Sequence, residues 1–72
     1  MDKPTIYHIR VKGHLDEALA SWFDGLTVSN LEDGNAILSG ELADQAALQG
    51  VLNRIGNLGL NLLSVDSVSE GD

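Results

Sequence analysis

Hydrophobic and polar residues alternate near the start of the chain, between Ile6 and Lys12. One face of this segment carries Tyr7, Ile9 and Val11, and the other carries His8, Arg10 and Lys12. A period of two is typical of a strand with one buried face. The pattern therefore predicts a first strand that ends at Gly13.

The next stretch, from His14 to Leu26, predicts a helix of about eight residues. Asp16 is a suitable N-terminal cap, and Gly25 suits the left-handed residue that ends a helix. The apolar residues at helical spacing are Leu19, Trp22 and Phe23. Because the chain has three aromatic residues in all, we expect the two in this helix to be the main bulk of the core.

Residues 26–31 and 35–42 predict two more strands around a turn that ends at Gly34. A two-residue Asp-Gly turn would pair Val28 with Ser39, whereas a three-residue loop with a left-handed Gly34 would pair Val28 with Leu38. We favour the longer loop because it keeps five apolar residues on one buried face. They are Leu26, Val28, Ala36, Leu38 and Leu42.

Asp44 predicts the cap of the longest helix, and Gly59 predicts its end. Its apolar stripe consists of Ala47, Leu48, Val51, Leu52, Ile55 and Leu58. Gly50 interrupts the helix at a cost of about 1 kcal/mol relative to alanine. We expect this glycine to permit close approach to the sheet or to the other helix.

Residues 60–68 predict a last strand, and residues 69–72 a polar tail. Leu63 and Val65 are expected to point inward, and Leu62, Ser64, Asp66 and Val68 outward. The predicted order of strands and helices is that of the ferredoxin-like split βαβ arrangement. We therefore expect one α+β domain over residues 1–72, with an ordered core of about 5–68. Its antiparallel sheet has four strands in the order 4-1-3-2, and both helices lie on one face.

The composition narrows the classes of function. A chain of 72 residues is marginally stable alone, so burial against a partner would help it. The chain has no cysteine, which excludes disulfides and thiolate zinc sites. A net charge of −7 opposes binding to nucleic acid and to anionic membranes. With no apolar run near the ~20 residues of a membrane span, we expect a cytoplasmic protein.

Few side chains are arranged for chemistry. His14, Asp16 and Glu17 cluster at a helix start without a second histidine or a cysteine to complete a metal site. The serines lack a histidine partner, and no phosphate-binding glycine loop precedes a helix. We predict no catalytic, cofactor-binding or metal-binding residues and no cofactor. Arg10 is expected to pair with Glu41 and Asp66 across the sheet.

Two resemblances concern the family of the protein. Residues 25–34, GLTVSNLEDG, resemble the second strand and turn of acylphosphatases, which implies a catalytic role for Asn30. That family also needs an arginine in a glycine-rich loop after the first strand, where this chain has Gly13-His14-Leu15-Asp16-Glu17. The resemblance therefore favours the fold but not the activity.

Most of the chain resembles a group of small uncharacterised bacterial proteins. The segments that carry this resemblance are Gly13-His14-Leu15, Trp22-Phe23-Asp24-Gly25-Leu26, Gly40, Asp44-Gln45-Ala46-Ala47-Leu48, Gly50, Arg54-Ile55, Leu58-Gly59-Leu60 and Ser64-Val65. The chain departs from the group at Gln49, where a histidine is usual, and at Gly56-Asn57, where charged residues are usual. The resemblance implies membership of a family and no particular mechanism.

Three hypotheses for function follow. The first is a non-enzymatic interaction module that forms a homo-oligomer or binds a protein partner, through the open sheet face or a strand edge. Its candidate interface residues are Ile6, Leu31, Ile37, Leu62 and Val68. The second is an ACT-like regulatory domain that binds a small ligand between subunits, near the Gly13 loop and the start of the second helix. The third is an enzyme.

Overall fold

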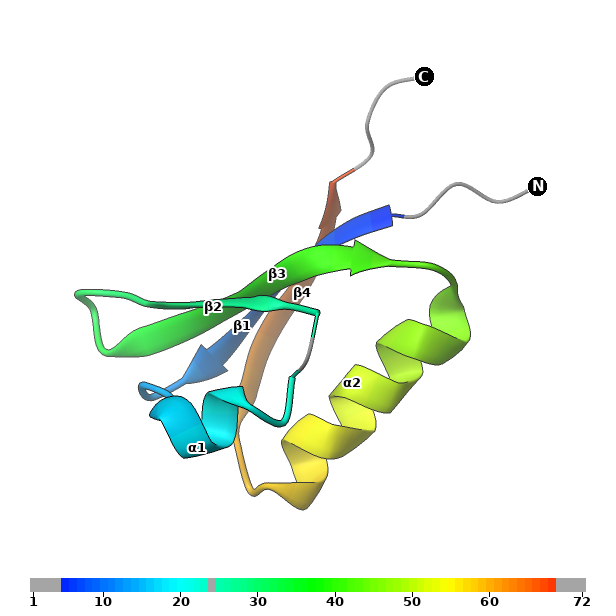
Figure 1. The fold of residues 1–72 in the computed structure, drawn as a ribbon. Helices are drawn as coiled ribbons and strands as arrows, with labels where there is room; N and C mark the ends of the chain where they lie inside the picture. The colour runs from blue at the N-terminus through cyan, green and yellow to red at the C-terminus, as the bar shows by residue number, and fades with distance from the viewer. Residues whose placement is uncertain (1–4, 24, 69–72) are drawn as a thin grey trace.

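The computed structural model describes residues 5–23 and 25–68. Figure 1 shows its elements, which are β1 (Thr5–Lys12), α1 (Glu17–Ala20), β2 (Thr27–Asn30), β3 (Asn35–Leu42), α2 (Gln45–Asn57) and β4 (Leu62–Val68). The four strands are antiparallel and lie in the order β2-β3-β1-β4, which is 4-1-3-2 when counted from the β4 edge. The predicted α+β class is confirmed, and the predicted tail, residues 69–72, lies outside the described residues.

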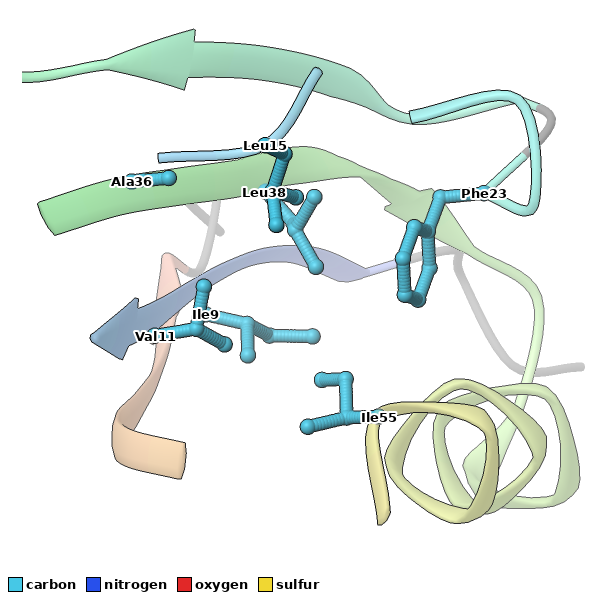
Figure 2. Close-up of a cluster of buried hydrophobic side chains, with 7 residues drawn as sticks. All are labelled: Ile9, Val11, Leu15, Phe23, Ala36, Leu38 and Ile55. Carbon is cyan, nitrogen blue, oxygen red and sulfur yellow. The ribbon is translucent and has the colours of Figure 1, made fainter. Parts of the chain in front are cut away.

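Figure 2 shows the side chains of the core, which lie between the sheet and α2. Its buried side chains in the described part of the chain are Ile9, Val11, Leu15, Phe23, Ala36, Leu38 and Ile55. The central strands β1 and β3 supply Ile9, Val11, Ala36 and Leu38. Leu19 of α1 and Val51 of α2 pack against the same cluster, so both helices cover one face of the sheet (Figure 1).

The hairpin between β2 and β3 has the register of the three-residue loop. Val28 lies opposite Leu38, and Gly34 has a φ of 93°, in the left-handed region that glycine adopts without strain. Leu26 precedes β2 but still packs on Gly40, because a Cβ atom at Gly40 would lie 2.8 Å from the Leu26 Cδ2. A side chain at position 40 would therefore push the hairpin and the preceding loop apart.

Both predicted helix caps are present. The Oδ1 atom of Asp16 accepts a hydrogen bond from the Leu19 amide at 2.9 Å, and that of Asp44 accepts one from the Ala47 amide at 2.8 Å. The first helix is shorter than expected, with four residues. Its end tightens because the amides of Trp22 and Phe23 donate to carbonyls three residues back, at 3.1 and 3.0 Å.

The expected burial of Trp22 is wrong, whereas that of Phe23 is confirmed. Phe23 is 3% exposed and Trp22 is 53% exposed. Two consecutive side chains at a tight turn cannot both face the core, and here the smaller ring enters it. The guanidinium of Arg54 lies over the exposed Trp22 ring, with its Cζ atom 5.9 Å from the ring centroid.

The expected role of Gly50 is also wrong. A Cβ atom built at Gly50 would have no heavy atom within 4 Å outside its own helical backbone. The same holds for Gly56 near the end of α2. Neither glycine is needed for packing, although each destabilises the helix by about 1 kcal/mol relative to alanine.

The positions of the two aromatic side chains predict different costs of truncation. Phe23→Ala should destabilise the protein by about 3–5 kcal/mol because it opens a cavity in the core. Trp22→Ala should cost about 1 kcal/mol or less because the ring is half in solvent already. Urea denaturation followed by far-UV circular dichroism measures both costs. A larger loss from Trp22→Ala than from Phe23→Ala would contradict this assignment of the core.

Candidate association surface

Three of the predicted interface residues lie on the sheet face that the helices leave open. Ile6 is opposite Val68 on β4, and Ile37 is opposite Arg10. Both partners of a cross-strand pair share one face, and the buried neighbours Ile9 and Val11 define the helix-covered face. Ile6 and Ile37 are only partly exposed, whereas Val68 is 41% exposed. On the open face, Ile6 and Ile37 therefore offer a partner less exposed apolar surface than Val68 does.

The predicted outward position of Leu62 is wrong. The pairing of β1 with β4 shifts between Arg10 and Val11, so that Arg10 lies opposite Ser64 and Val11 opposite Leu62. Leu63 is the extra residue of this β-bulge. Because Val11 faces the helices, its partner Leu62 lies on the helix side as well. The alternation that the sequence shows in this strand does not continue through the bulge.

β4 is an edge strand that neither layer of the protein covers. Every one of its residues is exposed. Val65 lies opposite Ile9 on the helix side, yet Val65 is 36% exposed and Ile9 is 0% exposed. The expected inward direction of Val65 is confirmed, but burial ends between β1 and β4, so that Val65 and Leu63 are both exposed.

The exposed apolar side chains of β4 form one surface, which we call the β4 edge. It consists of Leu62, Leu63, Val65 and Val68, which are 36–47% exposed. Val65 and Leu62 lie on the helix side, and Val68 lies on the open side with Ile6. Sequence reasoning missed Leu63 and Val65 because their pattern is that of a strand buried on one face. These side chains are exposed because β4 lies at the edge of the sheet.

The opposite edge of the sheet differs from the β4 edge. β2 has four residues, Thr27–Asn30, and β4 has seven. Three of the β2 side chains are polar, and its apolar residue Val28 packs against the core. A short, polar edge strand is a poor template for another chain, whereas a longer apolar one favours strand addition.

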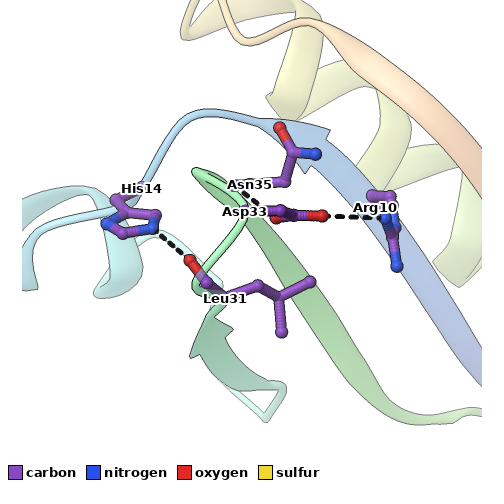
Figure 3. A network of polar contacts seen from close by, with 5 residues as sticks. All are labelled: Arg10, His14, Leu31, Asp33 and Asn35. Atoms are coloured by element: carbon purple, nitrogen blue, oxygen red, sulfur yellow. Dashed lines mark hydrogen bonds and ion pairs between the residues drawn. The ribbon is translucent and has the colours of Figure 1, made fainter.

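Arg10 of β1 pairs with the loop of the hairpin between β2 and β3. Arg10 Nη1 lies 3.4 Å from Asp33 Oδ2, and Asp33 Oδ1 accepts a hydrogen bond from the Asn35 amide at 3.0 Å (Figure 3). The predicted partners Glu41 and Asp66 are wrong, because they lie opposite Ile6 and His8. The Arg10 pair is exposed and contributes under about 1 kcal/mol.

Two polar side chains tie the loop after β1 to the hairpin. The side-chain oxygen Oδ1 of Asn30 accepts a hydrogen bond from the backbone N–H of Leu15 at 2.9 Å. The side-chain nitrogen Nδ2 of Asn30 donates one to the backbone carbonyl of Leu15 at 3.0 Å. His14 Nε2 lies 2.6 Å from the Leu31 carbonyl oxygen, to which it donates in the matching tautomer (Figure 3). Asn30 therefore uses both the oxygen and the nitrogen of its side-chain amide to hold Leu15.

Residues 5–23 and 25–68 lack both a cluster of metal ligands and a helix that could cross a membrane. They contain no group of three or more histidine, cysteine, aspartate or glutamate side chains placed to hold a metal ion. In the same part of the chain, no helix has the length and apolar character needed to cross a membrane.

Comparison with known proteins gives one match. The model of a family described as a domain of unknown function, DUF8691, matches residues 6–66. No curated protein and no solved structure matches the chain. The matched segment covers α1, β2, β3 and α2 in full and most of β1 and β4.

The double hydrogen bond of Asn30 predicts a structural cost when it is removed. Asn30→Ala leaves the amide and carbonyl of Leu15 without partners and should destabilise the protein by about 2 kcal/mol. Ser29→Ala, on the exposed neighbouring position, should change the stability by less than about 0.5 kcal/mol. Urea denaturation of the two variants measures the difference. Equal stabilities would show that the contacts of Asn30 with Leu15 contribute nothing.

Proposed function

We propose that the chain, which belongs to the family described as a domain of unknown function (DUF8691), is a non-enzymatic self-association module whose copies pair through β4. The observation that carries this proposal is the β4 edge. A seven-residue edge strand exposes Leu62, Leu63, Val65 and Val68 at 36–47%. Isolated exposed hydrophobic residues are ordinary, but a group along an edge strand marks an association surface.

We also propose that the fold is ferredoxin-like. The order of elements and the antiparallel order β2-β3-β1-β4 support this assignment. So does the packing of both helices against one face. In this arrangement β4 is an edge because, among the described strands, it pairs with β1 alone.

Pairing with a second copy would supply β4 with both hydrogen bonds and apolar contacts. The backbone groups on its outer side gain hydrogen-bond partners, and the apolar side chains on both faces are covered. Completing the burial of a half-exposed leucine stabilises an interface by about 1 kcal/mol. A domain of 72 residues gains more from such burial than a large protein does.

The charge on β4 favours one register. Two-fold symmetry requires the two strands to run antiparallel with the same residues on each side. A register centred on Val65 places Val65 against its copy and Asp66 against Ser64 of the second copy. A register centred on Asp66 would place two carboxylates face to face, which destabilises a sheet. We therefore propose pairing centred on Val65.

Sedimentation velocity from low to high micromolar concentrations tests the proposal. The wild type should form dimers, and Val65→Lys should be monomeric, since a lysine at the centre of the edge opposes strand pairing. Thr27→Lys adds the same charge to an exposed residue of β2 and should leave the dimer intact. Circular dichroism of all variants checks that each is folded. A wild type that remains monomeric at high micromolar concentration would rule out self-association.

A third variant distinguishes the β4 edge from the open face. Ile37→Lys places a charge on the open face at β3, two strands from the edge, and should not dissociate the dimer. Dissociation by Ile37→Lys and not by Val65→Lys would assign the interface to the open face. The dimer should also strengthen with salt, because two chains of charge −7 repel each other and salt screens that repulsion.

A further inference from the structure

A pocket of about 280 Å³ opens between α2, the end of β3 and the segment that joins α1 to β2. Its apolar walls include Phe23, Leu26 and Val51. Trp22 and Arg54 also line it. The volume is near the lower end of the range for small-molecule sites, which is about 300–1,000 Å³. It lies along α2 from Ala47 to Arg54, away from the Gly13 loop near which the ligand-binding alternative places its site.

Arg54 is held in a fixed position at this pocket. Its Nη1 donates a hydrogen bond to the Trp22 carbonyl at 2.7 Å, and its guanidinium carbon lies 5.9 Å from the Trp22 ring centroid. A guanidinium has five N–H donors, so this contact leaves donors for a further acceptor. An arginine positioned before a ligand arrives loses less entropy when it binds one.

Glu41, the other charged residue in the lining, does not neutralise the positive charge of Arg54 in the pocket. Glu41 contributes to the pocket, but its pairing with Ile6 places its side chain on the open face, on the far side of the sheet. Among the described residues, the charged side chain on the pocket side is therefore that of Arg54. The site combines apolar walls with one cation, which suits a ligand with an apolar body and one negative group.

Gly50 is the second observation that points to a ligand. It lines the pocket, and a Cβ atom there would meet no heavy atom within 4 Å. Packing thus gives no reason for a glycine that destabilises the middle of α2. Its effect is to leave open the space in front of Val51 and Arg54. Gly56 is equally unpacked but lies outside the pocket lining, so it provides a matched control.

We propose that this pocket binds a small carboxylate with an aromatic or branched apolar body. The apolar body lies against Phe23, Leu26 and Val51, and the carboxylate accepts hydrogen bonds from Arg54. The negative charge of the whole chain opposes an anion, so Arg54 must supply the attraction locally. A ligand of this size should bind with a dissociation constant on the order of millimolar or below. This binding does not require self-association.

Titration with 3-phenylpropionate tests the proposal, with 3-phenylpropanamide as its uncharged analogue. Trp22 is the only tryptophan, so its fluorescence reports on the pocket. The carboxylate should change the fluorescence in a saturable way, and the amide should bind about tenfold more weakly because it lacks the charge-assisted hydrogen bonds. Arg54→Gln should remove this preference. Equal affinity of the wild type for both compounds, or no saturable change, would overturn the proposal.

The two glycine variants separate binding from stability. Gly50→Ala and Gly56→Ala should both raise the midpoint of urea unfolding, since each replaces a helical glycine. Gly50→Ala should weaken binding of 3-phenylpropionate at least tenfold because the added methyl group enters the pocket. Gly56→Ala should bind like the wild type. Equal binding by the two variants would place the ligand elsewhere and refute the assignment of the pocket.

Discussion

The amount of helix available to cover the sheet is the constraint on which this structure depends. α1 has four residues and α2 has thirteen, and a helix of that length spans about 20 Å. This is enough to bury the central strands, where Ile9, Val11, Ala36 and Leu38 are 0% exposed. It is not enough to bury β4, which shares their face but keeps Val65 at 36% exposure. The exposed edge follows from the shortage of helix.

Local patterns in the sequence were sufficient for the order of elements, the helix caps and the hairpin register. Each rests on neighbouring residues: Asp16 and Asp44 cap the helices that begin just after them. Val28 opposite Leu38 follows from the loop length and the alternation. The chain therefore specifies its secondary structure with short-range signals, as well-folded sequences generally do.

The errors arise where the answer depends on distant parts of the chain. Trp22 and Phe23 are equivalent as hydrophobic residues, and the strands and α2, which pack against Phe23, decide which of them enters the core. The bulge beside Val11 moves the Leu62 side chain to the other face of the sheet, and no glycine or proline in β4 marks its position. Arg10 pairs with Asp33 because the hairpin brings its loop back beside β1. The pocket was missed for the same reason, since Trp22, Gly50 and Arg54 meet only after the fold has formed.

The two proposed surfaces lie on different parts of the sheet. The pocket uses β3, α2 and the segment before β2, whereas β4 lies beyond β1 in the order of strands (Figure 1).

The shortness of β2 determines how many copies the proposed assembly can contain. When two copies join through β4, the eight-stranded sheet that results has a β2 strand at each end. Four residues with three polar side chains offer little for a further chain to extend. In the dimer that we propose, β2 would therefore oppose the addition of further copies, so that the assembly would close at two copies and would not grow into a fibre.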